Sequence, residues 1–282
     1  MGIETWDARD AGEKSVGIVF TDVDGTLVDA DHHPIASTAP VMREVAARVP
    51  VCLVSARSPE GLYPIHEALG FTGPIACFSG AYVLDADGAE ITSKTFSAAV
   101  ARDAKDLLAR ELPQVAVGTY GYHEWIVDDR ANPLVAREEY FVQASARECG
   151  DVEGTFGERG VHKLLVMGDP EPILAAEALL SERYPQLSVV RSNANLCEVM
   201  VHGVSKSQAV GVICEHAGVD VAAAVAFGDA PNDLDMMGAV ERSFAMANAE
   251  DAVKAAASAV LPWSNVESGV ARALERLVLG RG

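Results

Sequence analysis

Residues 16–26 read VGIVFTDVDGT, an apolar run that ends in two aspartates and a glycine. The run is short, rich in β-branched residues and not alternating, which is typical of a strand buried on both faces of a parallel sheet. Asp22 and Asp24 follow it directly, and the glycine after them permits a sharp turn. The sequence therefore predicts a buried strand whose end carries a pair of carboxylates.

The same alternation of apolar strand and helix recurs on either side of a long central segment. Further strands are expected at residues 51–54, 74–78, 223–227 and 243–246, with helices at 39–48, 60–69 and 205–217. This repeated alternation of strands and helices predicts an α/β fold with a doubly wound, Rossmann-like parallel sheet. Its crossovers should be right-handed, and polar residues should lie at the carboxyl ends of its strands.

The pattern of apolar and polar residues changes between Tyr82 and Gly203. Shorter, alternating strands are expected there at residues 115–119, 124–127, 163–167 and 196–201, with helices at 98–111 and 172–183. Alternation indicates a sheet with one solvated face, unlike a doubly covered parallel sheet. We expect residues 83–203 to form an inserted α+β domain, and residues 1–82 and 204–282 to form the parallel-sheet domain that contains it.

Composition limits the partners. The 282 residues carry 22 basic and 41 acidic side chains, a formal net charge of -19, which disfavours nucleic acid and anionic membrane. No run approaches the roughly 18 apolar residues of a membrane span.

The first fifteen residues lack the apolar centre of a secretory signal and are expected to be a loose tail. Five cysteines without a CxxC pair favour reduced thiols. We expect a cytoplasmic monomer or homodimer.

The carboxylate pair at the first strand end has two interpretations. Beside a divalent cation, Asp22 could attack phosphorus and form an aspartyl-phosphate, while Asp24 could protonate the leaving oxygen and later activate water. Alternatively, DxDG is an ordinary surface turn whose aspartates accept backbone hydrogen bonds. The position directly after a buried strand favours the first interpretation.

A second acidic cluster follows the strand at 223–227. Asp229, Asn232 and Asp233 supply hard oxygen ligands within a short loop, which suits magnesium better than zinc. The alternative is an Asx turn in which Asp233 begins the next helix.

Ser55, at a strand end, could donate to a phosphoryl oxygen, and Lys206 could neutralise the nucleophile and the phosphoryl group. Each of these two alone is more often a cap or a solvated side chain.

Taken in order, these pieces resemble the haloacid dehalogenase (HAD) superfamily of phosphohydrolases, in particular its Cof-type branch with a large cap of the C2 type between the second and third motifs. The chain matches the family motifs at residues 22–27, 54–57, 203–206 and 228–233, and again at 245–249 and 264–271. The resemblance spans nearly the whole core.

The resemblance implies a role for each matching residue. Asp22 would be the nucleophile and Asp24 the acid/base, with Mg²⁺ held by Asp22, the main-chain carbonyl of Asp24, Asp229 and Asp233. The phosphate would be held by residues of the same motifs: Thr26, Ser55, Ala56, Arg57, Lys206, Asn232 and Asn248. Asn232 would orient Lys206 or the phosphoryl group, and Asn248 would lie near the phosphate rim.

Two positions depart from the family pattern. Ala56 and Ser79 stand where the family usually has glycine and asparagine, beside the substrate entrance. In the insert, the polar candidates for substrate contact are Arg130, Arg137, His162, Lys163, Arg191 and Glu198. The aromatic residues Tyr120, Tyr122, His123 and Trp125 favour cap packing over a ligand cage.

The function expected from the sequence is a magnesium-dependent phosphatase for a small phosphorylated metabolite such as a sugar phosphate, with a cap that closes over the strand ends. Two alternatives remain: a phosphomutase of the phosphomannomutase type, which returns the phosphoryl group to a sugar, and a non-catalytic phosphometabolite sensor that kept the fold.

Overall fold

A computed structural model describes residues 15–281. The loose tail expected at residues 1–15 lies, except for Ser15, outside the described residues. The chain divides into two compact units. The parallel-sheet unit comprises residues up to Arg57, then Leu62–Thr92 and Ser205–Gly282, and the inserted unit comprises Ser93–Val204, with Ser58–Gly61 grouped to it.

In the described part of the chain, the parallel-sheet unit contains an eight-stranded sheet of order β14-β13-β12-β1-β2-β3-β4-β5. Its strands are β1 (Ile18–Thr21), β2 (Val51–Val54), β3 (Ile75–Cys77), β4 (Tyr82–Leu84), β5 (Glu90–Ser93), β12 (Ala224–Gly228), β13 (Arg242–Ala245) and β14 (Ala259–Val260). The six from β14 to β3 pair in parallel, and β4 is antiparallel to β3. The predicted doubly wound α/β fold is confirmed.

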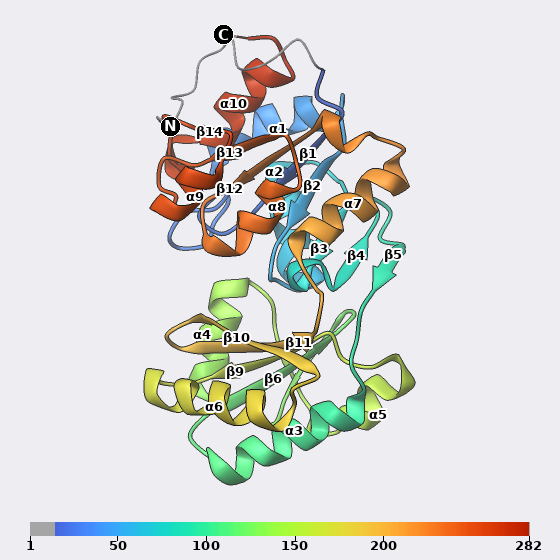
Figure 1. The fold of residues 1–282 in the computed structure, drawn as a ribbon, viewed down its shortest axis with the longest axis vertical. Helices are drawn as coiled ribbons and strands as arrows, with labels where there is room; N and C mark the ends of the chain where they lie inside the picture. The colour runs from blue at the N-terminus through green and yellow to red at the C-terminus, as the bar shows by residue number, and fades with distance from the viewer. Residues whose placement is uncertain (1–14, 282) are drawn as a thin grey trace. The chain divides into compact units, whose positions relative to one another are not determined.

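Helices cover this sheet (Figure 1). They are α1 (Ala39–Ala46), α2 (Pro59–Leu69), α7 (Lys206–Ala217), α8 (Leu234–Gly238), α9 (Asp251–Ala256) and α10 (Gly269–Leu277). Residues of α7 and α8, such as Ile213 and Met236, pack on Ile18, Phe20 and neighbouring strand residues. Val19 alternates with these and is equally buried, so β1 is covered on both faces. Its unbroken apolar sequence reflects this double burial.

The inserted unit is built on a six-stranded sheet of order β10-β11-β9-β6-β7-β8. Its strands are β6 (Ala116–Gly121), β7 (Glu124–Val127), β8 (Arg147–Glu148), β9 (Lys163–Met167), β10 (Leu187–Asn193) and β11 (Leu196–Val201), and its helices are α3 (Ala98–Glu111), α4 (Pro133–Val142), α5 (Val152–Phe156) and α6 (Pro170–Arg183). Every pair except β7 and β8 is antiparallel.

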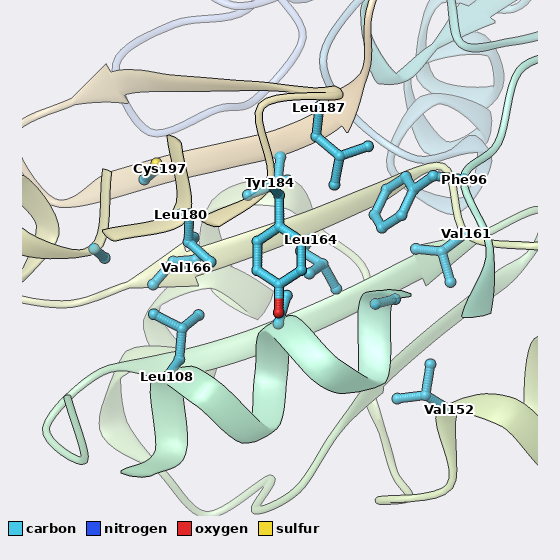
Figure 2. Packing of buried hydrophobic residues seen from close by; sticks show 14 of the residues in the cluster. Phe96, Leu108, Val152, Val161, Leu164, Val166, Leu180, Tyr184, Leu187 and Cys197 are labelled. Atoms are coloured by element: carbon cyan, nitrogen blue, oxygen red, sulfur yellow. The ribbon is translucent and has the colours of Figure 1, made fainter. Parts of the chain in front are cut away.

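The core of the inserted unit lies between one face of this sheet and its helices. Figure 2 shows Leu108 of α3 and Leu180 of α6 directed toward Leu164 and Val166 of β9. Alternate residues of β9 therefore point into this core, as expected for an antiparallel sheet.

The division between the units differs from the expected boundary. Residues 83–92, placed in the insert by the sequence analysis, contribute β4 and β5 to the parallel-sheet unit. β4 is buried at all three of its residues, whereas β5 at the edge of the sheet is only partly buried. The pairing of β4 with β3 and the complete burial of Val83 hold this hairpin to the larger sheet.

Candidate active site

The chemical groups collect where three neighbouring parallel strands end. Asp22 follows β1, Ser55 follows β2 and Asp229 follows β12. β1 lies between the other two in the sheet, with β12 on one side and β2 on the other. Since all three strands run in the same direction, their carboxyl ends bring these polar residues to one edge.

Lys206 joins two of the predicted acidic residues. Its Nζ donates to Asp22 Oδ1 at 2.6 Å and to Asp233 Oδ1 at 2.5 Å. All three side chains are buried. Lys206 is the first residue of α7, behind the cap formed by Ser205, whose hydroxyl accepts from the Gln208 N–H. The helix start therefore delivers the ammonium group into the acidic site.

The pKa values of Asp22 and Lys206 are both raised, but for different physical reasons. Burial raises the pKa of Asp22 well above its usual range, as does repulsion from Asp233, and the nearby Lys206 offsets this only in part. Burial lowers the pKa of Lys206, but attraction to Asp22 and Asp233 outweighs it, so the net shift is upward. The raised pKa keeps Lys206 protonated, and further positive charge near Asp22 would lower the pKa of this carboxyl group and favour its ionised form.

The second acidic cluster is held by local hydrogen bonds. Asp233 Oδ2 accepts from the N–H groups of Asp229 and Ala230 at 3.0 and 3.1 Å, and Thr26 Oγ1 donates to Asp229 Oδ1 at 2.9 Å. Burial raises the pKa of Asp229 to about 6, Thr26 opposes this rise, and Asp233 adds to it. Thr26, predicted to hold phosphate, orients a metal-ligand candidate in this arrangement.

Gly25 is required by the closeness of Asp229. Its φ is +78°, and a Cβ there would lie 2.2 Å from Asp229 Oδ2. Any other residue would be strained in its backbone and would displace a carboxylate of the site.

The three carboxylates fit a divalent cation. Asp22, Asp229 and Asp233 each offer one oxygen, and these oxygens lie within 4.8 Å of one another. Three acidic groups face one ammonium group, so a negative excess remains, and hard carboxylate oxygens are the ligands that Mg²⁺ and Ca²⁺ prefer. The donor set contains no sulfur or imidazole, which is unlike the usual zinc site.

Asp24 stands apart from this cluster and contacts a different set of groups. Arg57 donates to it twice, from Nε to Oδ2 at 3.0 Å and from Nη2 to Oδ1 at 2.6 Å. His32 Nδ1 lies 3.0 Å from the same Oδ1. Burial raises the pKa of Asp24, but the hydrogen bonds from His32 and Arg57 and the Arg57 charge outweigh it and lower this pKa well below its usual range.

The remaining predicted phosphate-binding residues have varied surroundings. Ser55 is buried, and its Oγ accepts from the Arg57 N–H at 3.2 Å. Ala56 is half-buried, and Asn232 is exposed on the turn before α8. The side-chain amide of Asn248 forms two hydrogen bonds with the main chain. Its Nδ2 donates to the Gly25 carbonyl at 2.8 Å, and its Oδ1 accepts from the Asn265 N–H at 2.9 Å.

His32 and Asn265 contact this region and were not assigned by the sequence reasoning. His32 lies in the 29–33 turn with φ +62°, and the DHH tripeptide at 31–33 gives no spacing signal that would link it to Asp24. Asn265 belongs to a matching motif but carried no predicted role. Ser79 also has a left-handed backbone, with φ +56°.

The polar candidates of the inserted unit divide into exposed and buried groups. Arg130 and Arg191 form exposed ion pairs with Glu139 and Glu177, and Arg137 lies over the Phe141 ring. Among the buried candidates, Lys163 Nζ lies 3.9 Å from a Glu198 oxygen.

Aromatic contacts surround the buried candidates. Tyr120 and Trp125 are buried and stacked at 4.9 Å between ring centroids. Lys163 lies over the Tyr120 ring, and Tyr122 meets His162 edge-on. His123 instead is about half exposed and pairs with Glu60.

Comparison with known proteins agrees with this arrangement. The sequence profile of the haloacid dehalogenase-like hydrolases matches residues 19–274. A Haemophilus influenzae protein, provisionally named a phosphatase, is 33% identical over 258 residues, which are 91% of this chain and 96% of that protein. The 5-amino-6-(5-phospho-D-ribitylamino)uracil phosphatase of Bacillus subtilis is 24% identical over 273 residues, 92% of this chain and 96% of its own.

A solved structure shares the fold. The crystal structure of a haloacid dehalogenase-like hydrolase from Bacteroides thetaiotaomicron superposes with a TM-score of 0.84 at 26% identity, and the match covers 93% of this chain and 100% of that one. Among residues 15–281, no helix combines the length and apolar character that crossing a bilayer requires.

Proposed function

The chain belongs to the haloacid dehalogenase-like hydrolase family, and we propose that it is a phosphatase that removes the phosphoryl group of a small phosphorylated metabolite through a covalent intermediate on Asp22. One observation carries this proposal: the buried Asp22 carboxylate contacts the Lys206 ammonium at a strand end, beside the Asp229 and Asp233 carboxylates. A held and neutralised carboxylate at this position suits attack on an anionic phosphate ester.

Asp22 supplies the nucleophile in this reaction. One of its oxygens forms a bond to phosphorus, the bond from phosphorus to the ester oxygen breaks, and an aspartyl-phosphate remains on the chain. Lys206 holds the other carboxylate oxygen and contributes a fixed positive charge to a phosphoryl group carrying negative charge. Asp233 keeps Lys206 in place from the other side.

Magnesium is the cofactor we propose, with Asp22, Asp229, Asp233 and the Asp24 carbonyl as its protein ligands. When bound, it would supply positive charge that keeps Asp22 ionised and stabilises the transferring phosphoryl group. The raised pKa values of Asp22 and Asp229 support this proposal, because both carboxyl groups hold their charge at a cost that a cation would offset.

Asp24 is proposed as the acid and base. It would give a proton to the leaving oxygen and later take one from the water that hydrolyses the aspartyl-phosphate. Its bonds to Arg57 and His32 favour the ionised form, so proton donation requires the carboxyl group to exchange these contacts for the ester oxygen. Arg57, released from Asp24, becomes available to a phosphoryl oxygen, alongside Ser55 at the neighbouring strand end.

The substrate class proposed is an alkyl phosphate such as a sugar or sugar-alcohol phosphate. The relative from Bacillus subtilis is named for a phosphoribityl compound, and another, from Serratia proteamaculans, is named an HMP-PP phosphatase. We propose that residues of the inserted unit choose among such compounds, with the buried Lys163 and Glu198 as the first candidates for substitution.

The test is a phosphate-release screen over several dozen metabolites with magnesium, followed by acid quench and mass spectrometry with the best substrate. Wild-type protein should release phosphate and carry a phosphate-mass adduct on the peptide containing Asp22. Asp22→Asn should lower turnover by several orders of magnitude, while Asp87→Asn, at an exposed aspartate of the same unit, should not.

The alternatives give different outcomes in the same assays. Isomerised sugar phosphate from hexose 1-phosphate with a bisphosphate activator would identify a mutase, and no turnover across the whole panel would favour a sensor. An adduct on a residue other than Asp22 would assign the covalent step to that residue, and turnover without any adduct would favour direct attack by metal-activated water.

A further inference from the structure

Two asparagines that are distant in sequence form hydrogen bonds to the turn that carries Asp24. Asn248 Nδ2 donates to the Gly25 carbonyl at 2.8 Å, and Asn265 Nδ2 donates to the Val28 carbonyl at 2.7 Å. The two are also joined to each other, since the Asn265 N–H donates to Asn248 Oδ1 at 2.9 Å. One follows β13 and the other precedes α10, so the turn is held from two segments more than 200 residues away in sequence.

The turn itself is a compact unit with little freedom toward Asp229. The N–H groups of Thr26, Leu27 and Val28 all point to the Val23 carbonyl, at 3.2, 2.8 and 3.2 Å. At Gly25 the backbone approaches Asp229 so closely that a Cβ would lie 2.2 Å from its carboxylate. The asparagines hold the turn through the Gly25 and Val28 carbonyls, so their loss would free it to move.

We infer that Asn248 and Asn265 are positioning residues for Asp24, acting by fixing the backbone of this turn. The inference rests on the proposed phosphatase function. It gives Asn248 a different task from the phosphate contact expected from the sequence, because its oxygen and one of its N–H groups are already bonded to main chain. Gly25 follows Asp24 directly, so a shift of its peptide group moves the acid relative to the ester oxygen.

The leaving group distinguishes positioning of the acid from binding of the phosphate. The ratio kcat/KM covers the steps up to aspartyl-phosphate formation, in which the Asp24 proton moves to the departing oxygen. An alkyl alcohol needs this proton, whereas p-nitrophenolate leaves readily as an anion. A misplaced Asp24 therefore slows an alkyl phosphate selectively, whereas a lost phosphate contact slows both esters equally.

The experiment compares kcat/KM for p-nitrophenyl phosphate and glucose 6-phosphate, or the best alkyl phosphate from the screen. Asn265→Asp and Asn248→Asp keep the side-chain shape, replace the donating amide nitrogen by an oxygen that cannot donate, and add one negative charge. The added charge repels both anionic esters alike, so its effect largely cancels in the ratio of their kcat/KM values. Each variant should lower the alkyl-to-aryl ratio of kcat/KM about tenfold, because small displacements of a catalytic group are costly. Asn195→Asp is the matched control: its Nδ2 donates to the Gly168 carbonyl at 2.9 Å in the inserted unit, and the ratio should not change.

Each other outcome has a defined meaning. Equal losses for both esters in the two variants would overturn the inference in favour of a phosphate contact or general destabilisation, and unchanged ratios with unchanged rates would overturn it outright. If Asn265→Asp does not fold, Asn248→Asp decides alone, since it retains the acceptor for the Asn265 N–H. Failure of the proposed function is separate: the wild type would then lack turnover, or Asp22→Asn would retain it.

Discussion

Lys206 balances the charges on which the candidate site depends. Its ammonium group, 1% exposed, contacts two buried carboxylates, and breaking a buried ion pair by removing one partner typically costs about 3–5 kcal/mol. We therefore predict that Lys206→Met lowers the free energy of unfolding by an amount of this order and reduces turnover by at least about a hundredfold.

Urea unfolding in magnesium-free buffer and steady-state kinetics would check this. Lys254→Met, at a half-buried lysine of α9, is the control and should change neither quantity much. Unfolding of Lys206→Met at the wild-type urea concentration would mean that the folded state does not depend on the contacts of Lys206 with Asp22 and Asp233.

His162 makes the inserted unit sensitive to acid. The side chain is fully buried; its Nδ1 accepts from the Tyr122 N–H at 3.0 Å and its Nε2 lies 3.0 Å from Ser93 Oγ. Burial, with a smaller effect of Arg159, lowers its pKa from 6.5 to about 3. Between these values the unfolded chain binds the proton and the folded chain does not, so stability falls as pH falls from 6.5 toward 3.

By pH 5 the predicted loss from His162 is about 2 kcal/mol. Hydrogen exchange in β9 at pH 7.5 and pH 5 would measure it in the inserted unit. His162→Asn, which offers an acceptor near the Nδ1 position, should show a smaller loss on acidification than the wild type, whereas the exposed His33→Asn should behave as the wild type does. An equal acid loss in wild type and His162→Asn would show that other groups cause it.

At the scale of elements, the strands that carry the site could be predicted and several others could not. The runs at 51–54 and 163–167 match β2 and β9 residue for residue, because both strands are buried along their whole length and therefore carry mainly apolar residues. β10 is an edge strand with four exposed residues at its end, so its sequence carries little of either pattern. α4 and α5 also went unpredicted.

Some residues of the candidate site could likewise be predicted from the sequence, and others could not. Asp22, Asp229 and Lys206 could be placed from strand ends and family motifs, because the geometry of a parallel sheet brings strand ends together. The contact of His32 with Asp24 could not, since it depends on a turn with a left-handed residue at its tip. The links from Asn248 and Asn265 to the same turn depend on tertiary pairing that no local pattern records.

The β4–β5 hairpin leads to a prediction about excision of the insert. Val83 of β4 is completely buried and belongs to the core cluster of the parallel-sheet unit, and Ile91 of β5 packs against that cluster. Replacing residues 94–204 by a short linker keeps both strands, whereas replacing residues 83–203 removes them and exposes the edge of β3.

We expect the first variant to be the more stable of the two, by several kcal/mol, since burying each large apolar side chain contributes about 1.5–3 kcal/mol. Soluble yield and urea midpoints would rank the variants. If the variant that lacks residues 83–203 proves equally stable, the hairpin belongs functionally to the insert and the boundary lies near Tyr82.

At the scale of the whole molecule, the formal charge of -19 opposes every anionic ligand. The candidate site shares this excess, with three carboxylates against one ammonium group. Binding of a dianionic phosphate ester would add repulsion, so we expect the protein to use a cation both to hold its acidic cluster and to accept substrate.

We predict that magnesium is required for turnover and stabilises one unit selectively. Thorough EDTA treatment should abolish phosphate release, and magnesium should restore it, whereas zinc alone should not, because the donor set consists of hard oxygens.

At a magnesium concentration a hundred times the dissociation constant, mass action adds about 2.7 kcal/mol to the stability of the part that binds it. The ligands come from β1, β12 and the turn before α8, so slower hydrogen exchange is expected in those elements and not in β6 or β9 of the inserted unit. Asp229→Asn, which removes one charged ligand, should weaken both the activation and the protection, whereas Asp87→Asn should leave both intact. Full activity in metal-free buffer would rule out magnesium as a required cofactor, and protection of β9 as strong as that of β1 would mean that the ion acts on the whole chain and not at this site.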